Sequence, residues 1–189
     1  MSIIKKIWNF IWKSNSLLSW IINIILAFLL VKFVIYPLIG LIFSTSFPIV
    51  AVVSGSMEHD TNFDIWWASQ SKWHSNYNRT LEEARDLPFA NGFNKGDIMI
   101  LRGVKPEKIN VGDVIVFKSN SKNPIIHRVI QKWKDSNTYY FQTKGDHNSD
   151  SFEAIGETRI PEENVLGKAI LRIPMLGWIK IFFTELTGL

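Results

Sequence analysis

The longest apolar segment of the chain covers residues 17–43, LLSWIINIILAFLLVKFVIYPLIGLIF. Three of its residues are clearly polar or charged: Ser19, Asn23 and Lys32. As a helix it is about 40 Å long, enough to cross a hydrocarbon core of about 30 Å. A cleaved signal peptide, the alternative, has an apolar core of only about 7–15 residues. We therefore predict one transmembrane helix over residues 17–43, which Pro37 or Gly40 either kinks or ends early.

The net charge of +4 comes entirely from the N-terminal part of the chain. Residues 1–43 contain four lysines and no acid, and the remaining residues carry equal numbers of acidic and basic side chains. The positive-inside rule then predicts that residues 1–16 form a basic cytoplasmic N-terminus and that residues 44–189 form an extracytoplasmic domain. A nucleic-acid-binding protein would carry its basic excess on the folded part, so no nucleic-acid partner is predicted.

The chain has no cysteine, which excludes disulfides, cysteine-based zinc sites, iron–sulfur clusters and a thiol nucleophile. The four histidines lack the His-Glu-x-x-His spacing of a zinc protease, so neither a metal site nor a cofactor is predicted. We expect His59, His74 and His147 to lie at the surface.

Residues 44–189 contain short runs of β-branched and aromatic residues separated by turn signals, which predicts a mainly β domain with an antiparallel sheet or barrel. The expected strands are residues 47–53, 97–101, 114–117, 125–130 and 139–143. A Gly-Asp pair precedes two of these runs, at residues 96–97 and 112–113, which we interpret as turn chemistry and not as an internal repeat.

Two segments do not follow this strand pattern. Residues 58–92 are polar and contain three tryptophans, and we interpret them as an insertion packed on the rim of the domain. Within it, the sequence TLEEAR at residues 80–85 predicts a capped helical turn. Residues 175–189 are apolar but too short for a second span, so either an interfacial helix or a core strand followed by a helix is expected.

Three separated segments together suggest a serine hydrolase. Ser56 lies in a Ser-Gly-Ser-Met turn after the first strand, His127 lies inside an apolar run, and Asp146 follows the last predicted strand. Serine needs an adjacent base to become a nucleophile, histidine has a suitable pKa, and a carboxylate orients the imidazole. Taken singly, Ser56 is a common turn residue and His127 a typical core histidine. The chain order Ser-His-Asp differs from that of chymotrypsin, subtilisin and the α/β-hydrolases.

In combination, five segments resemble type I signal peptidase, in its archaeal and endoplasmic-reticulum branch. They are SGSM at 54–57, GDIMIL at 96–101, GDVIVFK at 112–118, IIHRVI at 125–130 and TKGDHN at 143–148. They follow a single N-terminal span in the family's order, and the resemblance covers residues 17–180. It implies a membrane-bound serine endopeptidase that cleaves N-terminal signal peptides from exported preproteins after small residues, within a β-sheet catalytic domain.

The resemblance also implies the roles of individual residues. Ser56 is expected as the nucleophile and His127 as the base, where the bacterial branch has a lysine. The backbone N–H of Ser56 and the Ser54 hydroxyl are expected to form the oxyanion hole. Relatives carry a second aspartate shortly after the Gly-Asp pair, where this chain has phenylalanine. We therefore favour Asp150 as the acid that orients the imidazole, with Asp146 as a supporting acid or the alternative.

The substrate pockets are expected on the first strand. Ile49, Val50, Val52 and Val53 are predicted to line small apolar pockets that accept alanine-sized side chains, with the substrate added as a strand at a sheet edge. The expected partners are signal-peptide-bearing preproteins, the lipid bilayer and, as a further candidate, the protein-export channel. We expect a single-pass protein of the cell membrane. If the source is eukaryotic, we expect the membrane of the endoplasmic reticulum instead, with the domain in the lumen.

Two other interpretations stay open at this point. A serine peptidase of related fold would use a lysine base, for which Lys118, Lys122 and Lys144 are available. A non-enzymatic alternative is a membrane-anchored β-domain that binds a partner, in which residues 54–57 are only a turn and the tryptophan-rich insertion is a docking surface.

Overall fold

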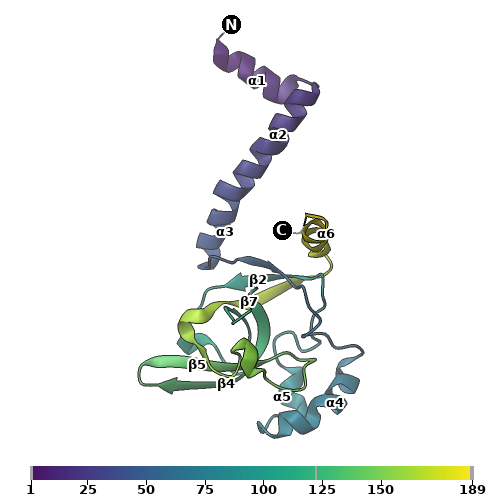
Figure 1. The fold of residues 1–189 in the computed structure, drawn as a ribbon, viewed down its shortest axis with the longest axis vertical. Coiled ribbons are helices and arrows are strands. Elements are labelled where there is room, and N and C mark those ends of the chain that lie inside the picture. The colour runs from purple at the N-terminus through teal and green to yellow at the C-terminus, as the bar shows by residue number, and fades with distance from the viewer. Residues whose placement is uncertain (1, 122, 188–189) are drawn as a thin grey trace. The chain divides into compact units, whose positions relative to one another are not determined.

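The computed structural model describes residues 2–121 and 123–187, and the chain divides into two compact units, residues 1–42 and 43–189. Helices make up the first unit (Figure 1): α1 (Ile3–Lys13), α2 (Leu17–Leu30), the π-helical turn η1 (Val31–Ile35) and α3 (Tyr36–Phe43). The last three form one continuous helix over Leu17–Phe43. By length and composition this is the one helix among the described residues that is able to cross a membrane.

Pro37 does not end this helix, which also continues through Gly40. A proline has no backbone N–H, and its ring would clash with the carbonyl oxygen four residues earlier in a regular α-helix. Directly before Pro37 the helix widens into the π-helical turn, in which the N–H of Tyr36 donates to the carbonyl of Val31. This wider turn lies at the proline, where the regular α-helical hydrogen bond is lost.

A seven-stranded antiparallel sheet forms the centre of the second unit and curls on itself, which confirms the mainly β fold (Figure 1). Its spatial order is β1-β2-β7-β3-β4-β5-β6, so β1 and β6 are the edge strands. The strands are β1 (Ile49–Ala51), β2 (Ile98–Arg102), β3 (Val114–Phe117), β4 (Ile125–Asp135), β5 (Thr138–Lys144), β6 (Ile160–Pro161) and β7 (Val165–Ile173).

The five predicted runs correspond to β1–β5, but β7 was not predicted although it lies between β2 and β3. Its sequence, VLGKAILRI, breaks the apolar alternation with Gly167, Lys168 and Arg172. The two charged side chains pair with aspartates and are only partly exposed. Nζ of Lys168 lies 2.7 Å from Oδ1 of Asp113, and Nε of Arg172 lies 2.6 Å from Oδ2 of Asp97.

Those two aspartates belong to the repeated Gly-Asp pairs, which are turns, as predicted. Gly96 and Gly112 adopt φ values of 91° and 97°, a left-handed region that favours glycine. In each turn the aspartate accepts a hydrogen bond at 2.8 Å from the backbone N–H three residues earlier. The same Gly-Asp turn therefore precedes both β2 and β3. Its aspartate also provides the carboxylate that pairs with a basic side chain of β7.

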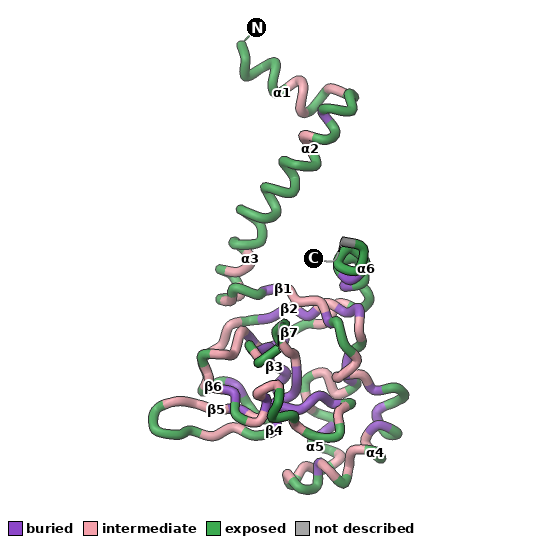
Figure 2. The backbone as a smooth tube through the Cα atoms, viewed as in Figure 1, coloured by how far each residue is buried: buried purple, intermediate pink, exposed green. Residues whose placement is uncertain are grey.

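Two apolar clusters pack on the two sides of the sheet. Val114 and Val116 of β3 face one cluster, and Ile115 and Phe117 face the other, because successive side chains of a strand point to opposite faces. Figure 2 shows buried residues along the strands of the sheet and in the loops that connect them. The first cluster also contains Met57, which is fully buried and contributes about 1.5–3 kcal/mol to stability by its burial.

The remaining helical segments lie outside the sheet. They are α4 (Phe63–Ser75), α5 (Leu81–Arg85), α6 (Trp178–Thr187) and the 3₁₀ turns η2 (Pro106–Lys108), η3 (Glu153–Ile155) and η4 (Glu162–Asn164). The predicted capped turn is α5, where Thr80 and Glu83 form a reciprocal capping box. Of the predicted C-terminal segment, the described residues form a turn followed by α6, and residues 188–189 lie outside them. The contact of α6 with lipid stays a prediction.

Candidate active site

Ser56 lies in the loop after β1 and is held on both sides. Its carbonyl oxygen accepts a hydrogen bond at 2.9 Å from the N–H of His147, in the loop after β5. The next residue, Met57, has its side chain in the core and its carbonyl bonded to the N–H of Phe93 at 3.0 Å. The Ser56 hydroxyl therefore has a fixed position at the domain surface and is partly exposed.

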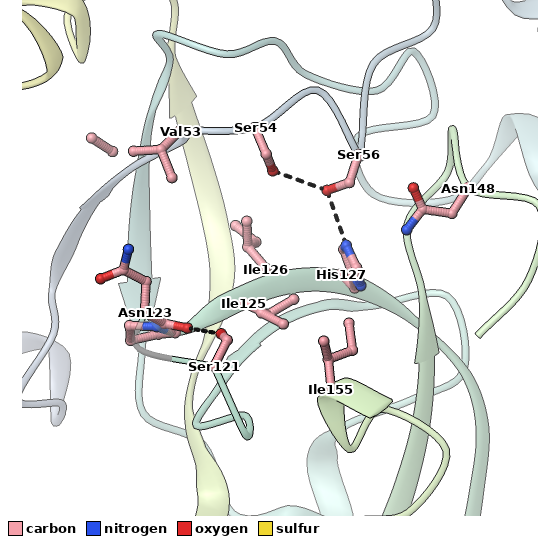
Figure 3. A pocket seen from close by; sticks show the side chains of 12 residues that line it. Val53, Ser54, Ser56, Ser121, Asn123, Ile125, Ile126, His127, Asn148 and Ile155 are labelled. Atoms are coloured by element: carbon pink, nitrogen blue, oxygen red, sulfur yellow. Dashed lines mark hydrogen bonds between the residues drawn. The ribbon is translucent and has the colours of Figure 1, made fainter. Parts of the chain in front are cut away.

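The imidazole of His127 contacts this hydroxyl. His127 lies on β4 opposite Ile115 of β3, and it is 3% exposed. Its Nε2 is 2.9 Å from the Oγ of Ser56, and Figure 3 shows the two side chains pointing at one another. This distance allows direct proton transfer from the hydroxyl to the ring.

The other ring nitrogen of His127 meets Glu157, an acid that the sequence did not predict for the site. Nδ1 lies 2.5 Å from Oε2 of Glu157, which is fully buried. The second carboxylate oxygen accepts from the N–H of Phe152 at 2.7 Å. With Nδ1–H donating to the carboxylate, Nε2 is left as an acceptor for the serine proton. Ser56, His127 and Glu157 thus form a continuous nucleophile–base–acid arrangement.

The chain returns to His127 through a tight turn. After η3, Gly156 adopts φ 76°, which reverses the backbone at the helix end. The N–H of Thr143 on β5 then donates to the carbonyl of Glu157 at 2.9 Å. The one sequence signal that could have indicated Glu157 is the glycine directly before it. A glycine followed by an acid also occurs at the Gly-Asp turns, so this signal does not single out the site.

The contact predicted for Asp150 or Asp146 is thus made by Glu157. Asp150 is exposed and accepts a hydrogen bond at 3.1 Å from Nε1 of Trp73 in the insertion. Asp146 is buried and accepts from Arg128 at 2.7 and 2.8 Å. The loop after β5 turns both aspartates toward the insertion, and the chain needs the further turn at η3 before an acid reaches the imidazole.

Asp146 and Arg128 join the insertion to the site. Arg128 also donates to the carbonyls of Pro88 and Phe89, at 2.7 and 3.1 Å. Burial alone raises the pKa of Asp146, but the charge and hydrogen bonds of Arg128 outweigh it, together with the bond from His59. The pKa of this carboxyl therefore lies well below its usual range.

The insertion has an aromatic core that the sequence did not indicate. The ring of His59 stacks on Trp66 with centroids 3.9 Å apart, and Trp66 donates to the carbonyl of Asp146 at 3.0 Å. His74 stacks on Trp67 at 5.0 Å. The expectation of surface positions was therefore wrong for His59 and His74, which are buried, and right for the exposed His147.

We expect His74 to make stability depend on pH. Burial, with the charges of Arg79 and Lys144, lowers its pKa from 6.5 to about 4. Between these values the unfolded chain binds more protons, so the free energy of unfolding falls on acidification. We expect a loss of about 2 kcal/mol between pH 6.5 and pH 4, after allowing for solvent screening. Urea unfolding in detergent at both pH values measures this loss.

The control for this prediction is His74→Phe. Phenylalanine keeps the stacking on Trp67, and neither ring nitrogen of His74 meets a hydrogen-bonding partner among the described residues. The variant should lose most of this dependence on pH. An identical pH dependence in both proteins would contradict the assignment to His74.

The lysine candidates for a Ser-Lys site lie elsewhere or outside the described residues. Lys118 is exposed, and Lys122 lies outside the described residues. Lys144 is buried, and burial lowers its pKa to about 8. Its Nζ donates to Gln70 of the insertion at 3.1 Å and lies 4.7 Å from the ring of Trp73.

A cavity of about 300 Å³ opens beside the Ser56 hydroxyl (Figure 3). Its apolar lining includes Ala51, Val53, Ile125, Ile126 and Ile155. The Ser54 hydroxyl also lines it, 3.3 Å from Oγ of Ser56.

Of the four residues predicted to form substrate pockets, Val53 lines this cavity. Val52 is buried in the first apolar cluster, and the partly buried Val50 packs against that cluster. Ile49 lies at the far end of β1, paired with Ile100. Strand alternation explains why Val50 and Val52 do not line the cavity, because they point to the opposite face from Ala51 and Val53. Ile49 shares the face of Ala51 but lies further from Ser56 along the chain.

No protein-family model matches the chain. Its relatives include the signal peptidase complex catalytic subunit SEC11 of Fusarium vanettenii, 33% identical over 99 residues, which are 49% of this chain and 57% of that protein. The protein of the same name from Scheffersomyces stipitis is 27% identical over 158 residues, 81% of this chain and 75% of the relative. The subunit SEC11C of Homo sapiens is 31% identical over 98 residues, 49% of this chain and 51% of the relative.

The matched region thus spans little more than half the length of two of these relatives. The names of these relatives confirm the resemblance found in the sequence. The chain is a homologue, at modest identity, of proteins named as catalytic subunits of the signal peptidase complex.

Proposed function

We propose that the chain is a membrane-bound serine endopeptidase that cleaves N-terminal signal peptides from exported preproteins after small residues. The observation that carries the proposal is the contact between Ser56 and His127, with Glu157 on the far side of the ring and an open cavity beside the hydroxyl. The names of the relatives supply the substrate class.

In the proposed acylation step, Oγ of Ser56 attacks the carbonyl carbon of the scissile bond while Nε2 of His127 takes the hydroxyl proton. The imidazolium is stabilised by the Glu157 carboxylate, which stays ionised. His127 then gives the proton to the leaving amine, and the signal peptide stays bound to Ser56 as an acyl ester. His127 next activates a water molecule, which hydrolyses the ester and restores the enzyme.

The negative charge on the carbonyl oxygen needs hydrogen-bond donors. The Ser54 hydroxyl lies close to Ser56, and we assign it with the Ser56 N–H to this oxyanion hole. A donor of this type contributes about 2.7–4 kcal/mol to transition-state stabilisation. The position of Ser54 at the cavity, on the same loop as the nucleophile, supports this assignment.

The cavity suggests how small residues are selected. Ala51 and Val53 lie on one side and Ile125 and Ile126 lie on β4, so a side chain entering between them meets apolar walls. The substrate is proposed to bind as an extended strand beside β1, which is an edge strand and leads directly to Ser56. This arrangement carries the scissile bond along β1 to the nucleophile.

The proposed topology has residues 1–16 in the cytoplasm, residues 17–43 across the membrane and residues 44–189 outside. Its support is the continuous apolar helix and the lysines before it. We assign the chain either to the cell membrane or to the endoplasmic reticulum with a lumenal domain. The bilayer and the export channel are the corresponding partners.

A reconstituted assay tests this function directly. The purified chain in lipid vesicles is incubated with a preprotein, and the masses of both products are measured. We expect a single cut directly after a small residue at the end of the signal peptide. A matched preprotein with phenylalanine at that position should stay intact. An unprocessed natural preprotein, or a cut after large residues, would contradict the proposal.

A further inference from the structure

The N-terminal helix α1 is amphipathic along its whole length. Its polar positions recur at one- and four-residue intervals and therefore lie on one face: Lys5, Lys6, Asn9 and Lys13. The other face carries large apolar side chains that are all exposed: Ile3, Ile4, Ile7, Trp8 and Trp12. No residue of α1 is buried. This apolar face thus has no covering element within the described residues.

Helix α1 is nevertheless fixed to α2. The Ser19 hydroxyl, which is fully buried, donates to the carbonyl of Phe10 at 2.7 Å. One turn further along α2, the Asn23 amide donates to the carbonyl of Ile11 at 2.9 Å. Both acceptors lie in the last turn of α1, where carbonyls lack partners within the helix. The two polar residues of the apolar segment therefore set the corner between the helices.

An 11-residue helix with an exposed apolar face is marginal in water, because helices of this length depend on packing against another surface. The corner bonds hold one end of α1 at the start of the apolar helix. If that helix spans a bilayer, the C-terminal end of α1 lies at the level of the lipid headgroups. Trp8 and Trp12, whose rings lie 5.6 Å apart, have the amphipathic character found at this level.

The charge of α1 selects the kind of lipid. Its polar face carries three lysines and no acidic residue. Lysines near a membrane surface attract anionic lipids, and this attraction falls off within a Debye length. We infer that α1 lies in the plane of the membrane, with its apolar face among the acyl chains and its lysines at the phosphates of anionic lipids. The inference rests on the proposed span, but it does not require peptidase activity.

The absence of cysteine makes a direct test possible. Ile7→Cys on the apolar face and Asn9→Cys on the polar face are made separately in the full chain and labelled with an environment-sensitive fluorophore. The chains are reconstituted in phosphatidylcholine vesicles with or without phosphatidylglycerol. We expect brominated acyl chains to quench the label at position 7 several-fold more than the label at position 9. The contrast should be larger in the anionic vesicles.

Two controls separate the causes of this contrast. Changing Lys5→Gln together with Lys6→Gln, or adding about 0.5 M salt, should reduce the contrast in anionic vesicles to that in phosphatidylcholine. A label at Leu29→Cys reports the span. Equal quenching at positions 7 and 9 would overturn the inference. So would a difference in quenching that is the same in anionic and in phosphatidylcholine vesicles. An unquenched label at position 29 would contradict the span on which the inference rests. Loss of signal-peptide cleavage with the contrast intact would refute the peptidase alone.

Discussion

Ser56→Ala and His127→Ala are each expected to lower kcat/KM for preprotein cleavage by about 10⁶-fold. The hydroxyl and Nε2 are 2.9 Å apart, so either change removes the contact through which the imidazole takes the proton of this nucleophile. Since the two side chains act as one unit, the double variant should lose no more activity than either single variant. Product formation is followed by mass spectrometry in lipid vesicles.

The folding of these variants needs its own measurement. Ser56 is partly exposed, and the buried Met57 next to it keeps its core contacts, so Ser56→Ala should retain the Tm of the parent. If His127→Ala keeps its activity while Lys144→Met loses it, the Ser-His assignment is refuted and a lysine base replaces it. Additive losses in the double variant would also argue against a shared proton-transfer step.

Glu157→Gln is expected to lower kcat by about 10⁴-fold, which is about 5.4 kcal/mol of transition-state stabilisation. The amide Oε1 still accepts from the N–H of Phe152, so the loop is retained. The amide N–H₂, however, would face Nδ1 of His127 and donate to it. The ring then carries its proton on Nε2, the nitrogen that must accept the serine proton. Single-turnover rates with a fluorescent preprotein measure this loss.

The matched control is Asp150→Asn. Asp150 is exposed and contacts Trp73, so this change should leave the rate close to that of the parent. Glu157→Asp retains a carboxylate on a shorter side chain and should restore part of the activity lost in Glu157→Gln. A larger loss in Asp150→Asn than in Glu157→Gln would return the orienting role to Asp150.

Much of the fold was predictable because its local patterns are strong. The apolar helix, five strands, the Thr80 capping box and both Gly-Asp turns each depend on residues that are close together in the chain. β7 was not predictable in this way, since its charges become acceptable only when Asp97 and Asp113 meet them across the sheet.

The same distinction applies to the site. Ser56 and His127 stand in short motifs, and the structure brings them together as the resemblance implied. Glu157 lies outside those motifs, and its place depends on the η3 turn and the reversal at Gly156. The burial of His59 and His74 depends on how α4 folds back on the loop after β5. Neither the loop path nor this packing is encoded in a local residue pattern.

The edge strand beside Ser56 has a further consequence. An edge that accepts an incoming peptide also offers its backbone to any other extended chain, including an unfolded copy of the protein. β1 has only three residues, Ile49–Ala51, before the chain turns toward the nucleophile. So short a template gives a misdirected chain few hydrogen bonds, which limits fibre-like self-association. Lengthening β1 would therefore be expected to make the protein more prone to aggregation.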